Sequence, residues 1–111
     1  MSETENFNME EKIICSAIWY KELPTPVYRP INVDKGTVVC GHRHPHCIHT
    51  MYSLTGKRSV EPEVGKYTQG FLTNKNRFVD RVEGLEIALA AGQVLDLSDV
   101  RGNRLHSEDL Y

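Results

Sequence analysis

Long apolar segments are missing from this chain of 111 residues. The longest apolar run, from Ile13 to Tyr20, is interrupted by Ser16 and is far too short to span a bilayer. The N-terminal stretch MSETENFNMEEK is polar and acidic, and it lacks the apolar core of a signal peptide. We therefore expect a soluble protein of the cell interior that has no membrane partner.

Cysteine and positive charge are also scarce. The three cysteines, Cys15, Cys40 and Cys47, are an odd number and cannot form a complete disulfide framework, which favours a reducing compartment. The formal net charge of -2 lacks the basic surplus of proteins that bind DNA or RNA polymers. This balance leaves room for a local cationic pocket that binds one small anion.

Signatures of common enzyme classes are absent as well. The sequence contains no G-x-x-x-x-G-K-[ST] phosphate loop, no G-x-G-x-x-G fingerprint and no G-x-S-x-G nucleophile elbow. Two-histidine phosphoesterases carry a repeated H-x-[ST] motif, whereas His49-Thr50 and His106-Ser107 are adjacent pairs. The sequence therefore predicts a protein that is not an enzyme.

One domain is expected at this length, spanning residues 1–111 with a flexible N-terminal tail over residues 1–10. β-Branched and aromatic residues predict strands at Ile13 to Tyr20, Thr37 to Cys40 and Lys66 to Thr73. KELPTPVYRPINVDKG, between the first two, carries three prolines and is expected to be an irregular or edge segment because proline cannot donate to a central ladder. VLDL, at 94–97, predicts a last short strand.

Gly70 lies inside the third predicted strand. A glycine at such a position marks a bulge or a close approach of two backbones. After a predicted turn at 74–76, a short extended piece is expected at 77–79.

The first predicted helix runs from Pro45 to about Leu54. Proline suits the first helical position, where its missing N–H is not needed, and Gly56 suits the stop. The helical spacing predicts one apolar face, made by Ile48, Met51 and Tyr52.

The second predicted helix begins after Asp80 and ends at Gly92. Asp80 and Glu83 form the acidic version of a capping box, and the expected buried stripe is Val82, Leu85 and Leu89. In the tail, Leu105, Leu110 and Tyr111 are expected anchors. The fold class is therefore α+β, with a small antiparallel sheet and two helices. Because the core is small, a homo-oligomer is expected.

A histidine and cysteine cluster, CGHRHPHCIH, offers a second interpretation. Thiolates and imidazoles are zinc ligands, but the spacing does not pair two close ligands with a distant pair. A metal-binding protein or a small metal-dependent phosphoesterase remains the alternative hypothesis. Its candidate ligands are Cys40, His42, His44, His46 and Cys47.

Arginine and aromatic residues gather near the ends of the predicted elements. Guanidinium groups match phosphate oxygens, and a Phe ring stacks on a nucleobase. Phe78 is more typical of the core and Arg101 of a solvated surface. Arg81, at a helix N-terminus, is electrostatically unfavourable there, which favours a functional reason.

These residues also carry a family resemblance. QGFLTNKNRFVDR, an alanine-rich helix, AGQ and the terminal SEDLY resemble the first-described family of phage Thoeris anti-defence sponges. G-x-R-H-x-x-C-I at 41–48 is similar to the same family. The resemblance covers 41–48 and most of 69–111, and the N-terminal third matches weakly.

The resemblance implies a binding protein without catalysis or cofactor, acting in the host cell cytoplasm. Members of that family bind the cyclic ADP-ribose-type signal made by bacterial TIR-domain proteins and hold it unchanged, so that the Thoeris effector never senses it. They are homodimers, which in some members assemble into hexamers. Some members also hold cyclic oligonucleotide signals at a separate site. The implied ligand-facing residues are Arg43, His44, Phe71, Asn74, Arg77, Arg81 and Arg104.

The resemblance assigns each group a part in the predicted site. Phe71 would stack on adenine, the arginines would neutralise the pyrophosphate, and Asn74 would hold a ribose. The isomer of the signal, the presence of a second site and the choice between dimer and hexamer stay open at this point.

Overall fold

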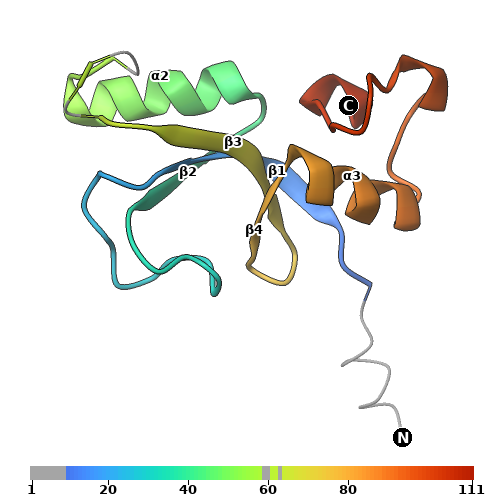
Figure 1. Ribbon diagram of the computed structural model, residues 1–111, viewed down its shortest axis with the longest axis horizontal. Coiled ribbons are helices and arrows are strands. Elements are labelled where there is room, and N and C mark those ends of the chain that lie inside the picture. The colour runs from blue at the N-terminus through green and yellow to red at the C-terminus, as the bar shows by residue number, and fades with distance from the viewer. Residues whose placement is uncertain (1–9, 59–60, 63) are drawn as a thin grey trace, which may run out of the picture.

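The computed structural model describes residues 10–58, 61–62 and 64–111, so most of the predicted N-terminal tail lies outside the described residues. Figure 1 shows how the sheet, the helices and the C-terminal segment are arranged. The strands are β1 (Ile13–Tyr20), β2 (Thr37–Gly41), β3 (Tyr67–Thr73) and β4 (Phe78–Asp80). The helices are α2 (His44–Thr55) and α3 (Arg81–Ala90), followed by the short 3₁₀ helices η1 (Leu97–Asp99) and η2 (Ser107–Asp109).

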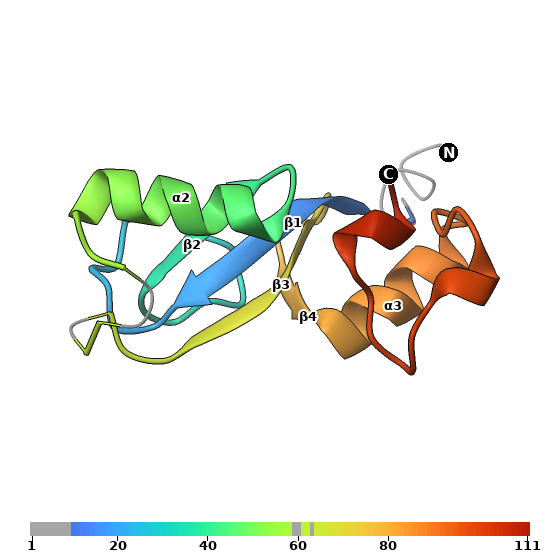
Figure 2. The same cartoon turned by 90° about the horizontal axis from the view of Figure 1, so that it is seen from above.

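The sheet is antiparallel throughout and has the order β2-β1-β3-β4. Ile18 pairs with Val39 on β2 and with Gln69 on β3, so these residues share a face. Both helices pack on this face, as Figures 1 and 2 show, α2 over one end and α3 over the other. The predicted α+β class, with a small antiparallel sheet and two helices, is confirmed.

A β-bulge near the start of β1 changes which side chains face the helices. Ile13 pairs with Thr73 and Cys15 with Leu72, so the register shifts between these two pairs. Ile13 packs in the α3 cluster, whereas Ala17 packs in a cluster on the opposite face. Because side chains alternate along a strand, Cys15 lies on the same face as Ala17.

The proline-rich connection folds back over that opposite face. Residues 21–36, all described, contain no strand, so of the two predicted alternatives, irregular or edge, the segment is irregular. Val33 packs against Ala17 and Phe78 there. The side-chain amide of Asn32 accepts from the backbone N–H of Phe78 and donates to its carbonyl, at 2.9 and 2.7 Å. Asn32 thus occupies part of the outer edge of β4.

α2 matches its prediction closely. It runs from His44 to Thr55, and Gly56 ends it in the left-handed conformation with φ 73°. Met51 is buried and Ile48 partly buried, but Tyr52 is exposed. The apolar face of this helix is therefore narrower than the periodicity predicted.

α3 is capped as predicted, but its buried face is formed by other residues than the predicted stripe. The carboxylate of Asp80 accepts from the amides of Val82 and Glu83. Glu83 does not complete a capping box, because its carboxylate binds Arg77 at 2.9 Å. The predicted burial of Val82 and Leu89 is wrong, since both are exposed. The residues of α3 that are buried are Gly84, Leu85 and Ala88.

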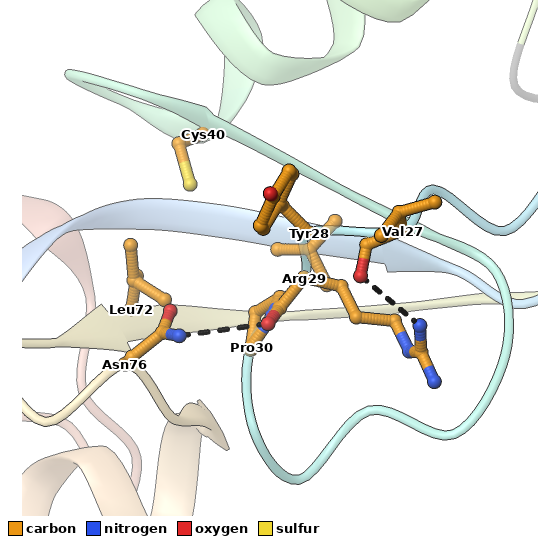
Figure 3. Close-up of a pocket in the computed structure, with 8 residues that line it drawn as sticks. Val27, Tyr28, Arg29, Pro30, Cys40, Leu72 and Asn76 are labelled. Atoms are coloured by element: carbon orange, nitrogen blue, oxygen red, sulfur yellow. Dashed lines mark hydrogen bonds between the residues drawn. The ribbon is translucent and has the colours of Figure 1, made fainter.

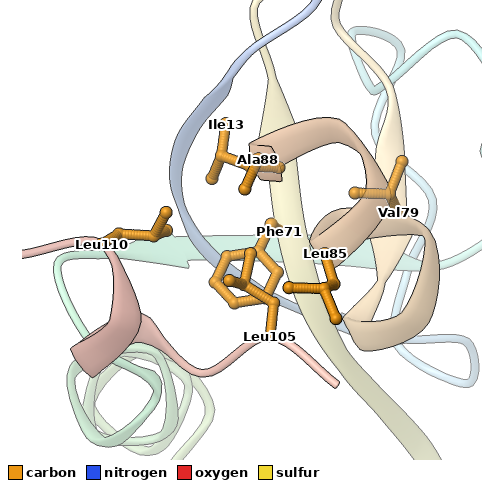
Figure 4. Packing of buried hydrophobic residues seen from close by; sticks show 7 residues of the cluster. All are labelled: Ile13, Phe71, Val79, Leu85, Ala88, Leu105 and Leu110. Carbon is orange, nitrogen blue, oxygen red and sulfur yellow. The ribbon is translucent and has the colours of Figure 1, made fainter. Parts of the chain in front are cut away.

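The C-terminal segment wraps back onto α3. The strand predicted at 94–97 is wrong: the Leu95 amide donates to the Asp109 carbonyl, and η1 follows. Leu105 and Leu110 are buried anchors, as predicted. They belong to a cluster in which Leu105 and Leu85 lie beside the ring of Phe71 (Figure 4).

Gly70 marks a close backbone approach, as the sequence indicated. A Cβ atom there would lie 2.0 Å from the Val79 carbonyl oxygen and 2.8 Å from the Phe78 ring. No side chain fits at this distance, so glycine is what allows β4 to pack against β3 at this point.

Candidate functional site

Two hollows meet beside β3, where α2 and α3 begin and the C-terminal segment passes. Gln69 and Arg81 line both of them. The hollow that we name the Arg81 hollow has a volume of about 330 Å³ and is lined by His44, Pro45, Ile48, Gln69, Arg81, Arg101, His106, Ser107 and Glu108. The neighbouring Tyr67 hollow, of about 340 Å³, is lined by Tyr67, Thr68, Gln69, Asp80, Arg81, Val82 and Arg104.

Arg81 is held in place by three acceptors from three parts of the chain. One Nη donates to the Leu105 carbonyl at 2.8 Å, and the other to Gln69 Oε1 at 2.5 Å and to His44 Nδ1 at 3.5 Å. Burial lowers the pKa of Arg81; Glu108 opposes this shift, and Arg104 adds to it. A guanidinium that is both desolvated and near another cation is stabilised by a bound anion.

The imidazole ring of His44 contacts Arg81 and helps to fix its position. Its side chain is 6 % exposed, and Nε2 lies 2.8 Å from the Gly70 carbonyl, which can only accept. Nε2 therefore carries the proton and Nδ1 accepts from Arg81, which is the neutral tautomer. The ring also stands edge-on to Phe71, with centroids 5.2 Å apart. The predicted ligand residue His44 is thus engaged at both nitrogens and acts as a positioning residue.

Burial lowers the pKa of His44 from 6.5, and the stability should follow this shift. His44 binds a proton more readily in the unfolded chain than in the folded chain. The stabilisation that neutral, buried His44 gives the folded state is therefore complete above about pH 6.5, and it is lost as the pH falls through the folded pKa. His44→Gln keeps a donor for Gly70 without titrating. Urea unfolding at pH 7.5 and 5.5 should show a larger loss for the wild type than for the variant. Equal losses would contradict the assignment.

Arg43 is the N-cap residue of α2 and contacts Ser107. Its Nη1 donates to Ser107 Oγ at 3.2 Å and its Nη2 to the Tyr111 main-chain oxygen, and the guanidinium stacks over the Tyr111 ring. The structure therefore places Arg43 near the Arg81 hollow but in contact with the C-terminal segment.

Three of the predicted site residues lie away from the hollows. Phe71 is 0 % exposed within the α3 cluster, so the expectation that its ring stacks on adenine is wrong for this structure. Asn74 accepts from the Lys12 amide at 2.8 Å and donates to the Glu10 carbonyl at 3.0 Å, which ties down the segment before β1. Arg77 binds the Glu11 carboxylate with two nitrogens, at 2.9 and 3.0 Å, and binds Glu83 as well.

Arg77→Ala should therefore affect stability and leave any ligand binding at the two hollows unchanged. The ion pairs raise the pKa of Arg77, with Glu11 as the main cause. Because the side chain is partly exposed, the loss should be about 0.5–1 kcal/mol. Chemical unfolding measures it, with Arg58→Ala as the matched control, since Arg58 pairs weakly with Glu61 at 3.9 Å. A change in ligand affinity in the Arg77→Ala variant would mean that Arg77 contacts the ligand.

The histidine and cysteine cluster is dispersed by the fold. Cys47 is on the buried face of α2, and the His46 ring accepts from the Arg43 amide at 3.1 Å. His42 stacks on Tyr111, and Cys40 lies on the opposite face of the sheet. Within the described part of the chain, no three side chains of the His, Cys, Asp or Glu type are close enough to hold a metal ion.

A protein-family model matches most of the chain. The model described as phage T4 y16D protein matches residues 12–111. The chain belongs to this phage protein family. Comparisons with curated proteins and with solved structures found no match. Across residues 10–58, 61–62 and 64–111, no helix of this family member is long and apolar enough to cross a membrane.

Several residues that line the two hollows were not predicted as site residues from the sequence. Tyr67 and Gln69 share a strand face with Phe71, and period-two alternation along β3 places them beside it. This signal was present in the sequence. Arg101, expected on the surface, is exposed and also lines the Arg81 hollow. His106 and Glu108 were missed because the C-terminal segment has no periodic pattern.

Proposed function

We propose that this phage protein sequesters a cyclic ADP-ribose-type signalling nucleotide and blocks activation of the Thoeris effector. The nucleotide is held uncleaved in the host cytoplasm. The observation that carries this proposal is the fixed guanidinium of Arg81, which lies where the two hollows meet. The resemblance to anti-defence sponges and the membership of a phage family support the same function.

The charge around Arg81 favours an anionic ligand. Arg101 and Arg104 line the flanking hollows. Among the described side chains, no carboxylate lies within ion-pair distance of any of these three arginines. Guanidinium groups match phosphate oxygens with paired hydrogen bonds. A pyrophosphate bound between the hollows would satisfy this cluster.

The nucleobase is assigned to Tyr67 in place of Phe71. Tyr67 is 38 % exposed and lines the same hollow as Arg81 and Arg104. Its ring already packs against Tyr20, with centroids 5.4 Å apart, which limits its motion. A stacked base contributes about 1–3 kcal/mol, and Tyr67 would supply that surface.

Holding without cleavage agrees with the state of His44. A general acid or base needs a nitrogen directed at the substrate, whereas both nitrogens of His44 bind protein groups. On this ground we assign His44 to binding and not to acid–base catalysis.

A second copy of the chain is proposed to close the site. Each hollow is small for a nucleotide, near the lower end of the range of about 300–1,000 Å³ for ligand pockets. A dimer that covers both would exclude water and strengthen the charge contacts. Light scattering at micromolar concentration should give a dimer or a larger assembly, and a stable monomer would contradict this part of the proposal.

Glu108 is the acidic group on the rim of the Arg81 hollow. Its pKa is lowered mainly by its own backbone amide and further by Arg43, so it is an anion at neutral pH. Glu108→Gln should therefore strengthen nucleotide binding by about twofold to fivefold at low salt, and less at high salt. Glu22→Gln is the matched control, because Glu22 pairs with Lys35 at 3.7 Å outside the two hollows. Weaker binding by the Glu108 variant would mean that this carboxylate contacts the ligand.

Calorimetric titration tests the function directly. The ligands are cyclic ADP-ribose, AMP and inorganic phosphate. The proposal expects cyclic ADP-ribose to bind at least about a hundredfold more tightly than AMP or phosphate. Equal, weak binding of all three would indicate a general anion pocket and would contradict the proposal.

A further inference from the structure

The face of the sheet opposite to the helices carries two thiols that the proposed function does not use. Cys40 on β2 is directly opposite Ala17 on β1, and Cys15 lies two residues before Ala17. Cys15 and Cys40 are therefore diagonal neighbours on one face. The bulge beside Cys15 brings the residue to this face, away from the α3 cluster.

The two thiols are close enough to shift each other's pKa. The thiol of Cys40 donates to the sulfur of Cys15, and this bond, helped by the backbone of Gly41, lowers the pKa of Cys15 to about 7. The same bond raises the pKa of Cys40. Of the two sulfurs, Cys15 is therefore the one that carries the thiolate more readily. This is the arrangement of an attacking thiolate next to a resolving thiol.

Of the two thiols, Cys40 is the more accessible to small reagents. Cys40 is exposed and lines a hollow of about 370 Å³, and Cys15 is partly buried. The hollow lies between Val38, Cys40 and Leu72 on the sheet and the Val27–Pro30 arm above it. Figure 3 shows the Cys40 sulfur pointing toward β1, the strand that carries Cys15.

We propose that Cys15 and Cys40 form a redox-active dithiol, which glutathione disulfide or a similar small disulfide oxidises to an intramolecular disulfide. The Cys15 thiolate attacks one sulfur of the small disulfide, forms a mixed disulfide and releases one thiolate. Cys40 loses its proton and attacks the Cys15 sulfur, and the second small thiolate leaves. The net reaction oxidises two protein thiols and reduces one small disulfide to two thiols.

Cys47 provides an internal control on the other face. It is on the buried face of α2, and its Sγ lies 3.6 Å from the Ser16 carbonyl oxygen. Burial raises the pKa of Cys47 to about 11. It should remain a thiol under conditions that oxidise the exposed pair.

The test equilibrates the full-length protein with mixtures of reduced glutathione and glutathione disulfide. Acid quenches the exchange, and N-ethylmaleimide then labels the remaining thiols in denaturant. Intact mass and a non-reduced peptide map read the products. The wild type should lose two of its three labelled thiols together, through a Cys15–Cys40 bond, while Cys47 stays labelled. Cys47→Ala should behave in the same way.

Cys40→Ser removes the resolving thiol. This variant should accumulate a stable glutathione adduct on Cys15 and form no internal bond. Cys40→Ala, which unlike serine leaves no side-chain donor at this position, should slow the reaction of Cys15 with N-ethylmaleimide roughly threefold to tenfold under native conditions. A persistent glutathione adduct in the wild type, a bond that includes Cys47, or three labelled thiols at every ratio would each overturn the proposal. The wild-type peptide map decides even where a variant fails to fold.

Discussion

Arg81→Ala should weaken binding of cyclic ADP-ribose by roughly tenfold to a hundredfold. Hydrogen bonds to charged groups contribute about 1.5–3 kcal/mol each, and an anion left beside a partly desolvated site without its cation loses most of that stabilisation. Calorimetric titration measures the change. Arg81→Lys should fall between the variant and the wild type, because it keeps the charge and loses the planar fork.

Two controls separate binding from folding in this experiment. Arg81→Ala also leaves Gln69 and the Leu105 carbonyl without a donor, so its thermal midpoint should fall. Arg58→Ala removes an exposed guanidinium that lines neither hollow, and its affinity should equal that of the wild type. Unchanged affinity in a folded Arg81→Ala protein would place the ligand elsewhere.

Phe71→Ala should destabilise the protein by about 3–5 kcal/mol. The side chain is fully buried among Ile13, Leu85 and Leu105, and removing a buried ring costs both its transfer free energy and the cavity left behind. Gly84 packs directly on the ring, since a Cβ there would be 3.1 Å from Phe71 Cδ2, so α3 would lose its support. Chemical unfolding measures the difference.

Tyr67→Ala is the partner experiment for Phe71. Tyr67 is on the same face of β3 but lines an open hollow. Its removal should reduce ligand affinity by the stacking contribution, about 1–3 kcal/mol, with a smaller loss of stability than Phe71→Ala. A Phe71→Ala protein that is destabilised by less than about 1 kcal/mol and loses affinity would mean that Phe71 is the stacking ring after all.

Local sequence patterns predicted most of the elements because their causes are local. Pro45 and Gly56 bound α2, and Asp80 caps α3, each through neighbours within a few residues. The strand predicted at 94–97 failed for a local reason too. Asp96 accepts from the Ser98 amide and hydroxyl and turns the chain into η1.

Contacts between distant residues were not predictable in this way. Glu11 and Arg77 meet only because β1 and β3 are paired. Phe71 was expected to face a ligand, since alternation along a strand does not show which face a helix will cover. Arg81 was singled out from the sequence because a cation at a helix N-terminus is unfavourable unless something else requires it, and it lines both hollows in the structure.

Capture and release of the signal tests the central claim most directly. The protein is mixed with the product of an active TIR-domain enzyme, free nucleotide is removed, and the protein is denatured by heat. Mass spectrometry then identifies the released material. The proposed function predicts an intact cyclic ADP-ribose-type nucleotide from the wild type and much less from Arg81→Ala. A linear or hydrolysed product would indicate an enzyme, and the absence of any nucleotide would contradict binding of this signal.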